Sequence, residues 1–262
     1  MSDRFQGRHV VVTGRGGGLG AAIAAAFAAE GASLTLMGRT RATLEAQATR
    51  LGGASGAKVR AATCDVADAA SVASAFATAI RDLGPVHVLI NNAGHAEAAP
   101  FEETSMESWQ RTIAVNLTGT FLCIQQVLPA MLAAGRGRII NIASTAGLRG
   151  YAQVSAYCAA KHGVVGLTRA LAAETARKGV TVNAVCPGYV DGSPMLDAAI
   201  ANVARSTGKS MADARAILAR RSPSGRFATL HEVTDEVVRL CSAEADATTG
   251  QAIVVAGGEV IS

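Results

Sequence analysis

Short, mostly apolar runs alternate with longer Ala-rich stretches along almost the whole chain. The short runs are rich in β-branched residues, which is typical of buried strands. The longer stretches carry apolar residues at helical spacing. This alternation predicts an α/β fold with one doubly wound parallel sheet and helices on both faces. The predicted strands are His9–Thr13, Ser33–Met37, Lys58–Cys64, Val86–Ile90, Arg138–Ala143, Val180–Val185 and Gln251–Val255.

Two helical stretches bear on function. A long helical pattern spans Ser105–Ala134. The stretch Asp191–Pro223 breaks the alternation, because it holds two short helical patterns, Pro194–Arg205 and Ser210–Arg221. An insertion at the carboxyl edge of a parallel sheet is well placed to cover a ligand. We therefore predict a substrate lid over about 191–223 within a single domain of residues 1–262, with an ordinary surface hairpin as the alternative.

The composition limits the function classes. Of 262 residues, 50% are hydrophobic and 17% charged, which suffices for one domain with a large core. The net charge of +4 is spread along the chain, so we expect no nucleic-acid surface. Five scattered cysteines have neither metal-ligand spacing nor a disulfide framework, which predicts no metal site and a reducing, cytoplasmic location. We expect no membrane span, because the longest apolar run, Leu19–Ala29, is too short, and no signal-peptide pattern is present.

A glycine-rich turn, Thr13-Gly14-Arg15-Gly16-Gly17-Gly18-Leu19-Gly20, joins the first predicted strand to an Ala-rich helix. Glycines let the backbone approach a diphosphate closely, and the N–H groups and dipole of a helix N-terminus favour negative charge. Glycine clusters also occur in ordinary turns, but this one lies between a strand and a helix, as phosphate binding requires. We predict that this turn binds the diphosphate of a dinucleotide, with Gly14, Arg15, Gly18, Leu19 and Gly20 among the cofactor-binding residues.

The end of the second strand bears on the choice of dinucleotide. Where NAD-binding sheets carry an acid for the ribose 2′-hydroxyl, this chain has Gly38 and Arg39. A guanidinium at this position can receive a 2′-phosphate, and Arg15 is placed to assist it. NADP(H) is therefore favoured. NAD(H) is the alternative, in which Arg39 is only a solvated turn residue.

Polar residues follow two further strands. Asp65-Val66 end the third, where Asp65 either accepts from the adenine amino group or caps the helix that begins near Ala69. Asn91-Asn92-Ala93-Gly94 close the fourth, where the amides can bond neighbouring loops and Gly94 leaves room for a cofactor. Asn116 lies among apolar residues of the long helical pattern, and a buried Asn needs hydrogen-bond partners. A purely structural role is open for it.

Ser144, Tyr157 and Lys161 are the strongest candidates for chemistry. Positions i and i+4 share a helix face, so Lys161 is expected beside Tyr157. A Tyr pKa of about 10 makes a poor base at neutral pH, and an adjacent ammonium lowers it. Ser144 ends a predicted strand, where its hydroxyl could hold a carbonyl oxygen. Such a Tyr–Lys pair also occurs by chance on helix surfaces, so its weight comes from the rest of the chain.

These residues together resemble the classical short-chain dehydrogenase/reductase family over nearly the whole chain. The motifs occur in the family's order and at its spacing; each is weak alone, and the set is specific. The resemblance implies a Rossmann-type sheet, a nicotinamide cofactor and often a homotetramer. The matching residues are Thr13-Gly14-x-x-x-Gly18-x-Gly20, Asp65, Asn91-Asn92-Ala93-Gly94, Asn116, Ser144, Tyr157-x-x-x-Lys161 and Pro187-Gly188.

The same resemblance implies roles for individual residues. Tyr157 would be the general acid/base and Ser144 would bond the substrate carbonyl. Lys161 would bond the nicotinamide ribose and lower the pKa of Tyr157, and Asn116 would hold a water in the proton relay. The remaining cofactor-binding residues would be Asp65, Val66, Asn92, Ala93, Gly94, Pro187, Gly188 and Val190.

One departure from the family pattern concerns the cofactor's carboxamide. A Thr usually stands four positions past the Gly of Pro-Gly and contacts that group. This chain has Gly192 there. The contact is therefore in doubt unless the following residue, Ser193, replaces it.

The stretch Tyr157–Val190 is most similar to the 3-oxoacyl-thioester and polyketide ketoreductase branch of the family. This implies a ketone or secondary-alcohol substrate, carried as a CoA or carrier-protein thioester, whose acyl part would lie under the lid. Gln153, Tyr189 and Met195 join Ser144 and Tyr157 as substrate-binding candidates.

Two alternatives stay open. The first is an NAD-dependent secondary-alcohol or 3-hydroxyacyl-CoA dehydrogenase. The second, of another class, is a non-catalytic dinucleotide-binding sensor. The complete set of Asn116, Ser144, Tyr157 and Lys161 argues against a sensor, because a sensor need not keep a proton relay.

Overall fold

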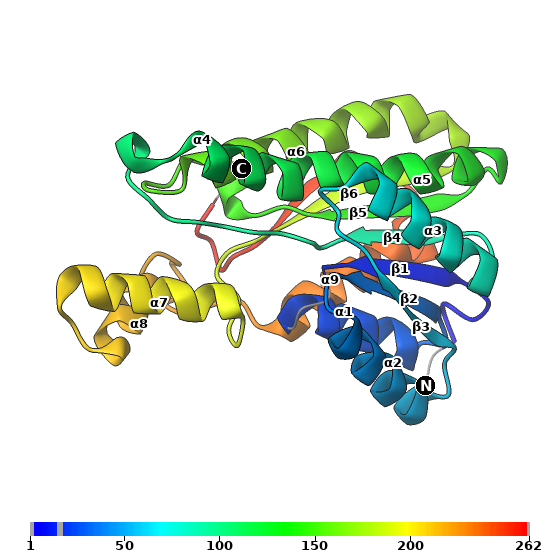
Figure 1. The fold of residues 1–262 in the computed structure, drawn as a ribbon, viewed down its shortest axis with the longest axis horizontal. Coiled ribbons are helices and arrows are strands. Elements are labelled where there is room, and N and C mark those ends of the chain that lie inside the picture. The colour runs from blue at the N-terminus through cyan, green and yellow to red at the C-terminus, as the bar shows by residue number, and fades with distance from the viewer. Residues whose placement is uncertain (1–2, 15–17, 261–262) are drawn as a thin grey trace.

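A single parallel sheet of seven strands forms the centre of the protein (Figure 1). The computed structural model describes residues 3–14 and 18–260. The strand order is β3-β2-β1-β4-β5-β6-β7, so the chain moves outward from β1 to β3 and then returns to place β4 on the other side of β1. This confirms the predicted doubly wound sheet. The strands are β1 (His9–Thr13), β2 (Ser33–Gly38), β3 (Val59–Thr63), β4 (Val88–Asn91), β5 (Gly137–Ile142), β6 (Val180–Pro187) and β7 (Ala252–Val255).

Helices cover both faces of the sheet (Figure 1). Residues of β1 alternate between two cores: Val10 and Val12 pack with α1, α2 and α9, whereas Val11 packs with α3, α5 and α6. Burial on both faces explains why the strands are nearly continuous apolar runs. The helices are α1 (Gly18–Ala29), α2 (Arg41–Ser55), α3 (Ala69–Leu83), α4 (Met106–Ile113), α5 (Gly119–Ala133), α6 (Ser155–Thr175), α7 (Pro194–Thr207), α8 (Met211–Ala219) and α9 (Leu230–Cys241).

The long helix predicted over Ser105–Ala134 is interrupted. Between α4 and α5 the segment Ala114–Thr118 is a π-helix. A π-turn adds one residue to the helical repeat and often occurs at functional sites. It is invisible to a periodicity analysis, because the apolar spacing continues on both sides. Asn116 lies within this segment and is fully buried.

Within the described chain, the continuous stretch Met106–Ala133 has the length and mean hydropathy, 1.3, to cross a membrane. A core helix of a water-soluble protein passes the same test. Cys123, Val127 and Met131 of this stretch lie in the core under the sheet, packed with Leu89 and Ile139. The stretch alone is therefore weak evidence for a membrane span.

The predicted lid range holds α7 and α8, which extend from the carboxyl edge of the sheet (Figure 1). Their apolar faces meet each other and Phe227 in a small separate core that includes Leu196, Ile200 and Leu218. Ser193 caps α7 and Ser210 caps α8, each accepting a backbone N–H. The α7–α8 segment thus has its own packing and joins the sheet through few residues.

Gly14→Ala is expected to lower the free energy of unfolding by more than about 3 kcal/mol. Gly14 has φ of +72°, and a Cβ there would lie 2.2 Å from the backbone Cα of Ala93. Gly53→Ala is the matched control, because Gly53 lies in α2 with open space around it. It should gain about 0.5–1 kcal/mol. Chemical denaturation of both variants checks this, and a Gly14→Ala protein as stable as wild type would refute it.

Candidate active site

The ends of β1 and β4 are tied together at the point where the strand order reverses. The Thr13 hydroxyl accepts from the backbone N–H groups of Asn92 and Ala93, at 3.1 and 3.2 Å. The Asn92 side-chain amide donates to the carbonyls of Thr13 and Gly14, both at 3.0 Å. Ligands of open parallel sheets bind in the crevice at this reversal. The structure therefore brings Gly14, Asn92 and Ala93 together where the sequence predicted a cofactor.

The N-terminus of α1 approaches the same point. A Cβ on Gly20 would lie 2.6 Å from the side-chain Nδ2 of Asn92. Glycine at this position therefore lets α1 lie close to the Asn92 side chain. The first turn of α1, with Gly18 and half-buried Leu19, holds no acidic residue. Its N–H groups and dipole are therefore free to attract an anion. Arg15, predicted to assist there, lies outside the described residues.

Arg39 and Asp65 lie at the carboxyl ends of β2 and β3. Arg39 is exposed and forms no ion pair with any residue in 3–14 or 18–260. Asp65 accepts the N–H of Ala67 through one oxygen, at 3.0 Å. Asp68, rather than Asp65, caps α3, so the capping alternative for Asp65 is wrong. An exposed guanidinium, a helix whose first turn holds no acidic residue, and Gly14 at the end of β1 together fit a phosphorylated dinucleotide.

Asn116 connects the π-helical segment to the loop after β4. Its amide donates to the carbonyls of His95, at 2.7 Å, and Thr112, at 2.9 Å. Its oxygen accepts the His95 N–H at 3.3 Å. A Cβ on Gly94 would lie 3.2 Å from the Asn116 oxygen and 3.8 Å from the Lys161 Nζ. Gly94, Asn116 and Lys161, far apart in sequence, therefore meet at one place.

Ser144, Tyr157 and Lys161 gather at the end of β5. Ser144 begins a short 3₁₀ turn, where its hydroxyl accepts the N–H of Ala146. Tyr157 and Lys161 lie on one face of α6, with the Lys161 Nζ 5.6 Å from the centre of the Tyr157 ring. Lys161 donates to the carbonyl of Ile142 at 2.7 Å. Both side chains are buried, with exposed fractions of 7% and 4%.

The three substrate-binding candidates outside this group differ in position. The Tyr157 hydroxyl lies 4.0 Å from the sulfur of Met195, at the start of α7. Tyr189 packs edge-to-face on Phe227, with ring centres 6.3 Å apart. Gln153 is exposed and has φ of +65°, and its carbonyl accepts the N–H of Ala99. Met195 is thus beside the Tyr157 hydroxyl, whereas Gln153 contributes its backbone carbonyl to a hydrogen bond between two loops.

Comparison with known proteins identifies the family. The model of the short chain dehydrogenase family matches residues 8–204. This chain belongs to the short chain dehydrogenase family. A protein of Streptomyces violaceoruber named as a ketoacyl reductase of the granaticin polyketide synthase is 42% identical, covering 95% of this chain and 91% of its own. The D-threitol dehydrogenase of Mycolicibacterium smegmatis is 40% identical, covering 98% and 95%.

The fold of this short chain dehydrogenase also matches a solved structure closely. A crystal structure of actinorhodin polyketide ketoreductase, a single-residue variant with NADPH, superposes with a TM-score of 0.93. The two sequences are 37% identical, and the match covers 99% of each chain. The resemblance inferred from the sequence motifs, including its ketoreductase branch, is confirmed.

The effect of Lys161 on the pKa of Tyr157 stays a prediction for this dehydrogenase, and burial acts on that pKa in the opposite direction. Burial raises the pKa of Tyr157 to about 12, and hydrogen bonding with Ser144 opposes that rise. Burial also lowers the pKa of Lys161 to about 8. Desolvation is the largest cause of both shifts, because burial disfavours the phenolate and the ammonium alike. The phenol is protonated at neutral pH, as an unshifted Tyr also is.

Residues at the carboxyl end of the dehydrogenase pack against the loop before α6, a contact that the sequence did not predict. The Tyr151 hydroxyl donates to a carboxylate oxygen of Glu259 at 2.7 Å, and Arg149 donates to the Glu259 carbonyl. A Cβ on Gly188 would lie 2.9 Å from the other Glu259 oxygen. The tail thereby lies between the loop before α6 and the Pro187-Gly188 turn. No local pattern signals these contacts, since they join residues 108 positions apart.

The Gly192 departure from the family pattern has a conformational explanation. Gly192 has φ of +73°, which disfavours a Thr at this position. The hydroxyl of Ser193 accepts the N–H of Leu196 as the cap of α7. The Ser193 hydroxyl acts as an acceptor in this cap, so its own O–H can still donate a hydrogen bond to a ligand. Val190 pairs with Ala228, and the N–H of Gly188 donates to the Val255 carbonyl, so the segment after β6 is held on both sides.

Lys161→Met is expected to raise the free energy of unfolding at pH 7 by on the order of 1–3 kcal/mol, after the lost Ile142 hydrogen bond is counted. Burial lowers the pKa of Lys161 from 10.5 to about 8. Below pH 8 the amine is charged in both the folded and the unfolded protein, so the buried ammonium lowers the free energy of unfolding by the full amount. Between pH 8 and 10.5 the unfolded chain binds more protons than the folded protein, so the stability of wild type rises with pH. The difference in stability between Lys161→Met and wild type therefore shrinks over this range.

Urea denaturation at pH 7 and 9.5 checks this prediction. Lys178→Met, at an exposed position, is the control and should show no such pH dependence. A Lys161→Met protein less stable than wild type at pH 7 would contradict the expectation.

Proposed function

We propose that this protein is an NADP(H)-dependent reductase that converts a ketone, most specifically a 3-oxoacyl thioester or related carbonyl, into a secondary alcohol. The observation that carries the proposal is the apolar environment of a protonated Tyr157. Ala96, Ala146 and Val154 pack around this phenol. The Met195 thioether lies beside its hydroxyl. Such surroundings favour an acyl chain next to the reacting carbonyl.

The carboxyl edge of the sheet offers a place for each part of the cofactor. Gly14, Gly18 and the N-terminus of α1 would hold the diphosphate. Arg39 would receive the 2′-phosphate, and Asp65 with Val66 would lie by the adenine. The nicotinamide would lie between Asn92-Ala93-Gly94 and Pro187-Gly188-Tyr189-Val190, and when bound it would supply the hydride.

Tyr157 would donate the proton to the carbonyl oxygen, while Ser144 holds that oxygen by a hydrogen bond. The protonated phenol is the form that can donate to a carbonyl oxygen during reduction. Lys161, fixed by the Ile142 carbonyl, would orient the cofactor ribose and resupply the proton. Asn116 keeps both its amide and its oxygen on the His95 backbone, so it would hold the relay's geometry.

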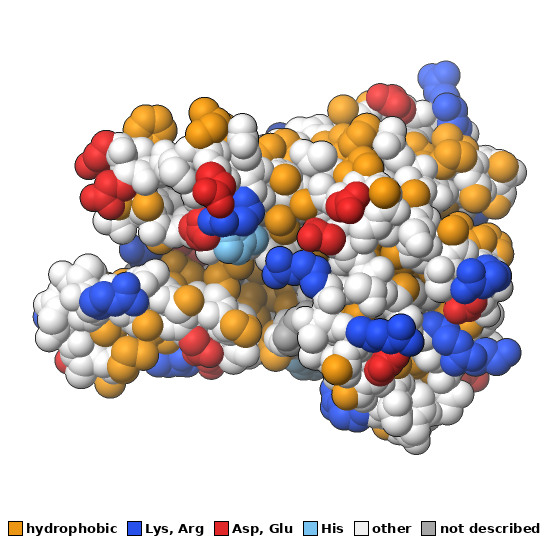
Figure 2. Space-filling view, in the orientation of Figure 1, with side chains coloured by type: hydrophobic (Ala, Val, Ile, Leu, Met, Phe, Trp, Pro, Cys, Tyr) orange, Lys and Arg blue, Asp and Glu red, His pale blue; other side chains and the backbone are white. Residues whose placement is uncertain are grey.

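The α7–α8 segment would act as a lid. Figure 2 shows a hollow between this segment and the body of the protein, with hydrophobic side chains on its floor. The acyl part would occupy this hollow beneath Met195, and Tyr189 would line its side. The arm of a CoA or carrier-protein thioester would leave through the open end. Closing the lid would exclude water from the Tyr157 hydroxyl.

An NAD-dependent dehydrogenase acting on an alcohol is the second candidate, because relatives of similar identity carry such names. The D-β-hydroxybutyrate dehydrogenase of Cupriavidus necator is 38% identical, covering 98% of this chain and 99% of its own. Oxidation needs Tyr157 deprotonated, which its burial disfavours. A sensor without catalysis is less favoured, because Asn116, Ser144, Tyr157 and Lys161 are all present.

The homotetramer implied by the family remains a prediction. Phe101, Met106 and Phe121 are large apolar side chains exposed on or next to α4 and α5, with exposed fractions of 76%, 68% and 44%. Faces of this kind commonly mark contacts between chains. Light scattering of the purified protein measures the assembly directly.

Tyr157→Phe is expected to lower kcat for ketone reduction by 10²–10⁴-fold, roughly the contribution of a positioned general acid. Cofactor affinity, measured by fluorescence titration, should change little, because the ring remains in place. Tyr151→Phe is the matched control, since its hydroxyl bonds Glu259 rather than facing Met195. Retention of wild-type kcat in Tyr157→Phe would refute the proposed proton donor.

Arg39→Ala is expected to remove a preference for NADPH over NADH of at least about tenfold, equivalent to about 1.4 kcal/mol. Arg39 is free to bond a 2′-phosphate, whereas its neighbour Arg41 is already paired with Glu45. Titration of both cofactors into wild type, Arg39→Ala and the control Arg41→Ala separates the two positions. Equal or tighter NADH binding by wild type would favour the dehydrogenase candidate instead.

A further inference from the structure

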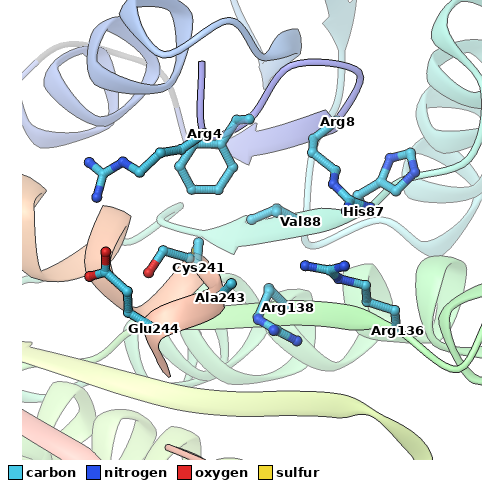
Figure 3. A pocket seen from close by; sticks show the side chains of 11 residues that line it. Arg4, Arg8, His87, Val88, Arg136, Arg138, Cys241, Ala243 and Glu244 are labelled. Carbon is cyan, nitrogen blue, oxygen red and sulfur yellow. The ribbon is translucent and has the colours of Figure 1, made fainter. Parts of the chain in front are cut away.

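A cavity of about 310 Å³ lies at the amino edge of the sheet, at the opposite ends of the strands from Tyr157 (Figure 3). It is formed by the segment before β1, the starts of β4 and β5, and the residues around the end of α9. The charged side chains that line it are Arg4, Arg8, Arg136, Arg138 and Glu244, and His87 and Ser242 are polar residues of the same lining. No role in the proposed reaction involves any of them.

The basic side chains concentrate at one end of this cavity. Figure 3 shows Arg8, Arg136 and Arg138 on one side and Arg4 with Glu244 on the other. Arg4 is paired with Glu30. Arg8 and Arg136 form no ion pair with any described residue. Burial and the charges of Arg8 and Arg136 lower the pKa of His87, so these groups are close enough to repel a further positive charge.

Arg138 is buried beneath them, with an exposed fraction of 5%. Its guanidinium donates to the Gly137 carbonyl at 2.9 Å and pairs with Asp246, which is largely exposed. Its Nε–H is buried and has no hydrogen-bond partner among the described residues. Burial, together with repulsion from Arg136 and Arg8, lowers the pKa of Arg138 despite Asp246. A buried donor without a partner and adjacent like charges both cost stability, which an anion in the cavity would offset.

His87 adds a neutral donor to this group. Its Nδ1 accepts the backbone N–H of His9 at 3.0 Å. The ring proton of the neutral imidazole is therefore on Nε2. His87 can donate this proton to an anion without becoming charged.

We propose that this cavity is a binding site for a small phosphate-bearing anion. Guanidinium groups form paired hydrogen bonds with phosphate oxygens. Arg8, Arg136 and Arg138, together with the His87 N–H, offer more hydrogen-bond donors than the one carboxylate of the lining, Glu244, can accept. A volume of about 310 Å³ is of the size found for small-molecule sites rather than for a docked protein segment. The site is separate from the proposed cofactor position, which lies at the other edge of the sheet.

Arginines at this edge could serve only to offset the negative carboxyl-terminal ends of helices such as α9. That role and the proposed site make opposite predictions. If Arg136 only stabilises the fold, its removal lowers the free energy of unfolding without any ligand. If it belongs to an anion site, removal relieves repulsion and leaves the unliganded stability unchanged or higher.

Pyrophosphate titration by calorimetry, at constant ionic strength and with the dinucleotide site saturated by NADPH, tests the site. One pyrophosphate is expected to bind per chain. Arg136→Gln and Arg8→Gln should each weaken binding at least tenfold. Arg81→Gln is the control: it removes the same charge from the carboxyl end of α3, which lies at the same edge, without lining the cavity. It should change affinity less than twofold, and Arg39→Ala should retain binding.

Four results would overturn the proposal. The first is no pyrophosphate binding to wild type, and the second is equal weakening by all three edge variants, which would indicate general electrostatic attraction. The third is a fall in the unliganded stability of Arg136→Gln with pyrophosphate affinity unchanged, which would assign Arg136 to the fold alone. Loss of binding in Arg39→Ala would place the anion at the cofactor phosphate instead.

Discussion

The close contact between the ends of β1 and β4 is the constraint on which the rest of the site depends. Gly14 packs directly on the backbone of Ala93, and the Thr13 hydroxyl holds the two N–H groups that follow β4. This contact fixes the crevice at the reversal of strand order. It also sets the path of the chain onward to Gly94, which must pass within contact distance of Asn116 and Lys161. The residues predicted to bind the cofactor and those predicted to relay the proton therefore meet at one backbone junction.

Much of this arrangement could be predicted because its signals are local. The seven strands and the Tyr157–Lys161 spacing each depend on residues that are neighbours in the sequence. The π-helical segment around Asn116 could not be predicted, because the apolar pattern continues through it. The Glu259 contacts and the cluster around Arg138 could not be predicted either, since they join distant segments through side-chain geometry.

The pKa of Tyr157 shows a different limit of sequence analysis. Spacing correctly placed an ammonium beside the phenol, at 5.6 Å from the ring centre. The spacing does not reveal how deeply the phenol is buried, and burial decides the direction of the Tyr157 pKa shift. Desolvation disfavours the charged form of both groups, so it raises one pKa and lowers the other. An adjacent ammonium alone predicts a lowered pKa for Tyr157, whereas the buried phenol has a raised pKa.

The same burial couples the proton donor to the α7–α8 segment. Met195, at the first turn of α7, is the side chain nearest to the Tyr157 hydroxyl on that side. The segment has its own small core and caps, so it can shift without unpacking the sheet. Movement away from Tyr157 would admit water, stabilise the phenolate and bring both shifted pKa values back toward their ordinary range. The position of α7 would thus change how strongly Tyr157 holds its proton.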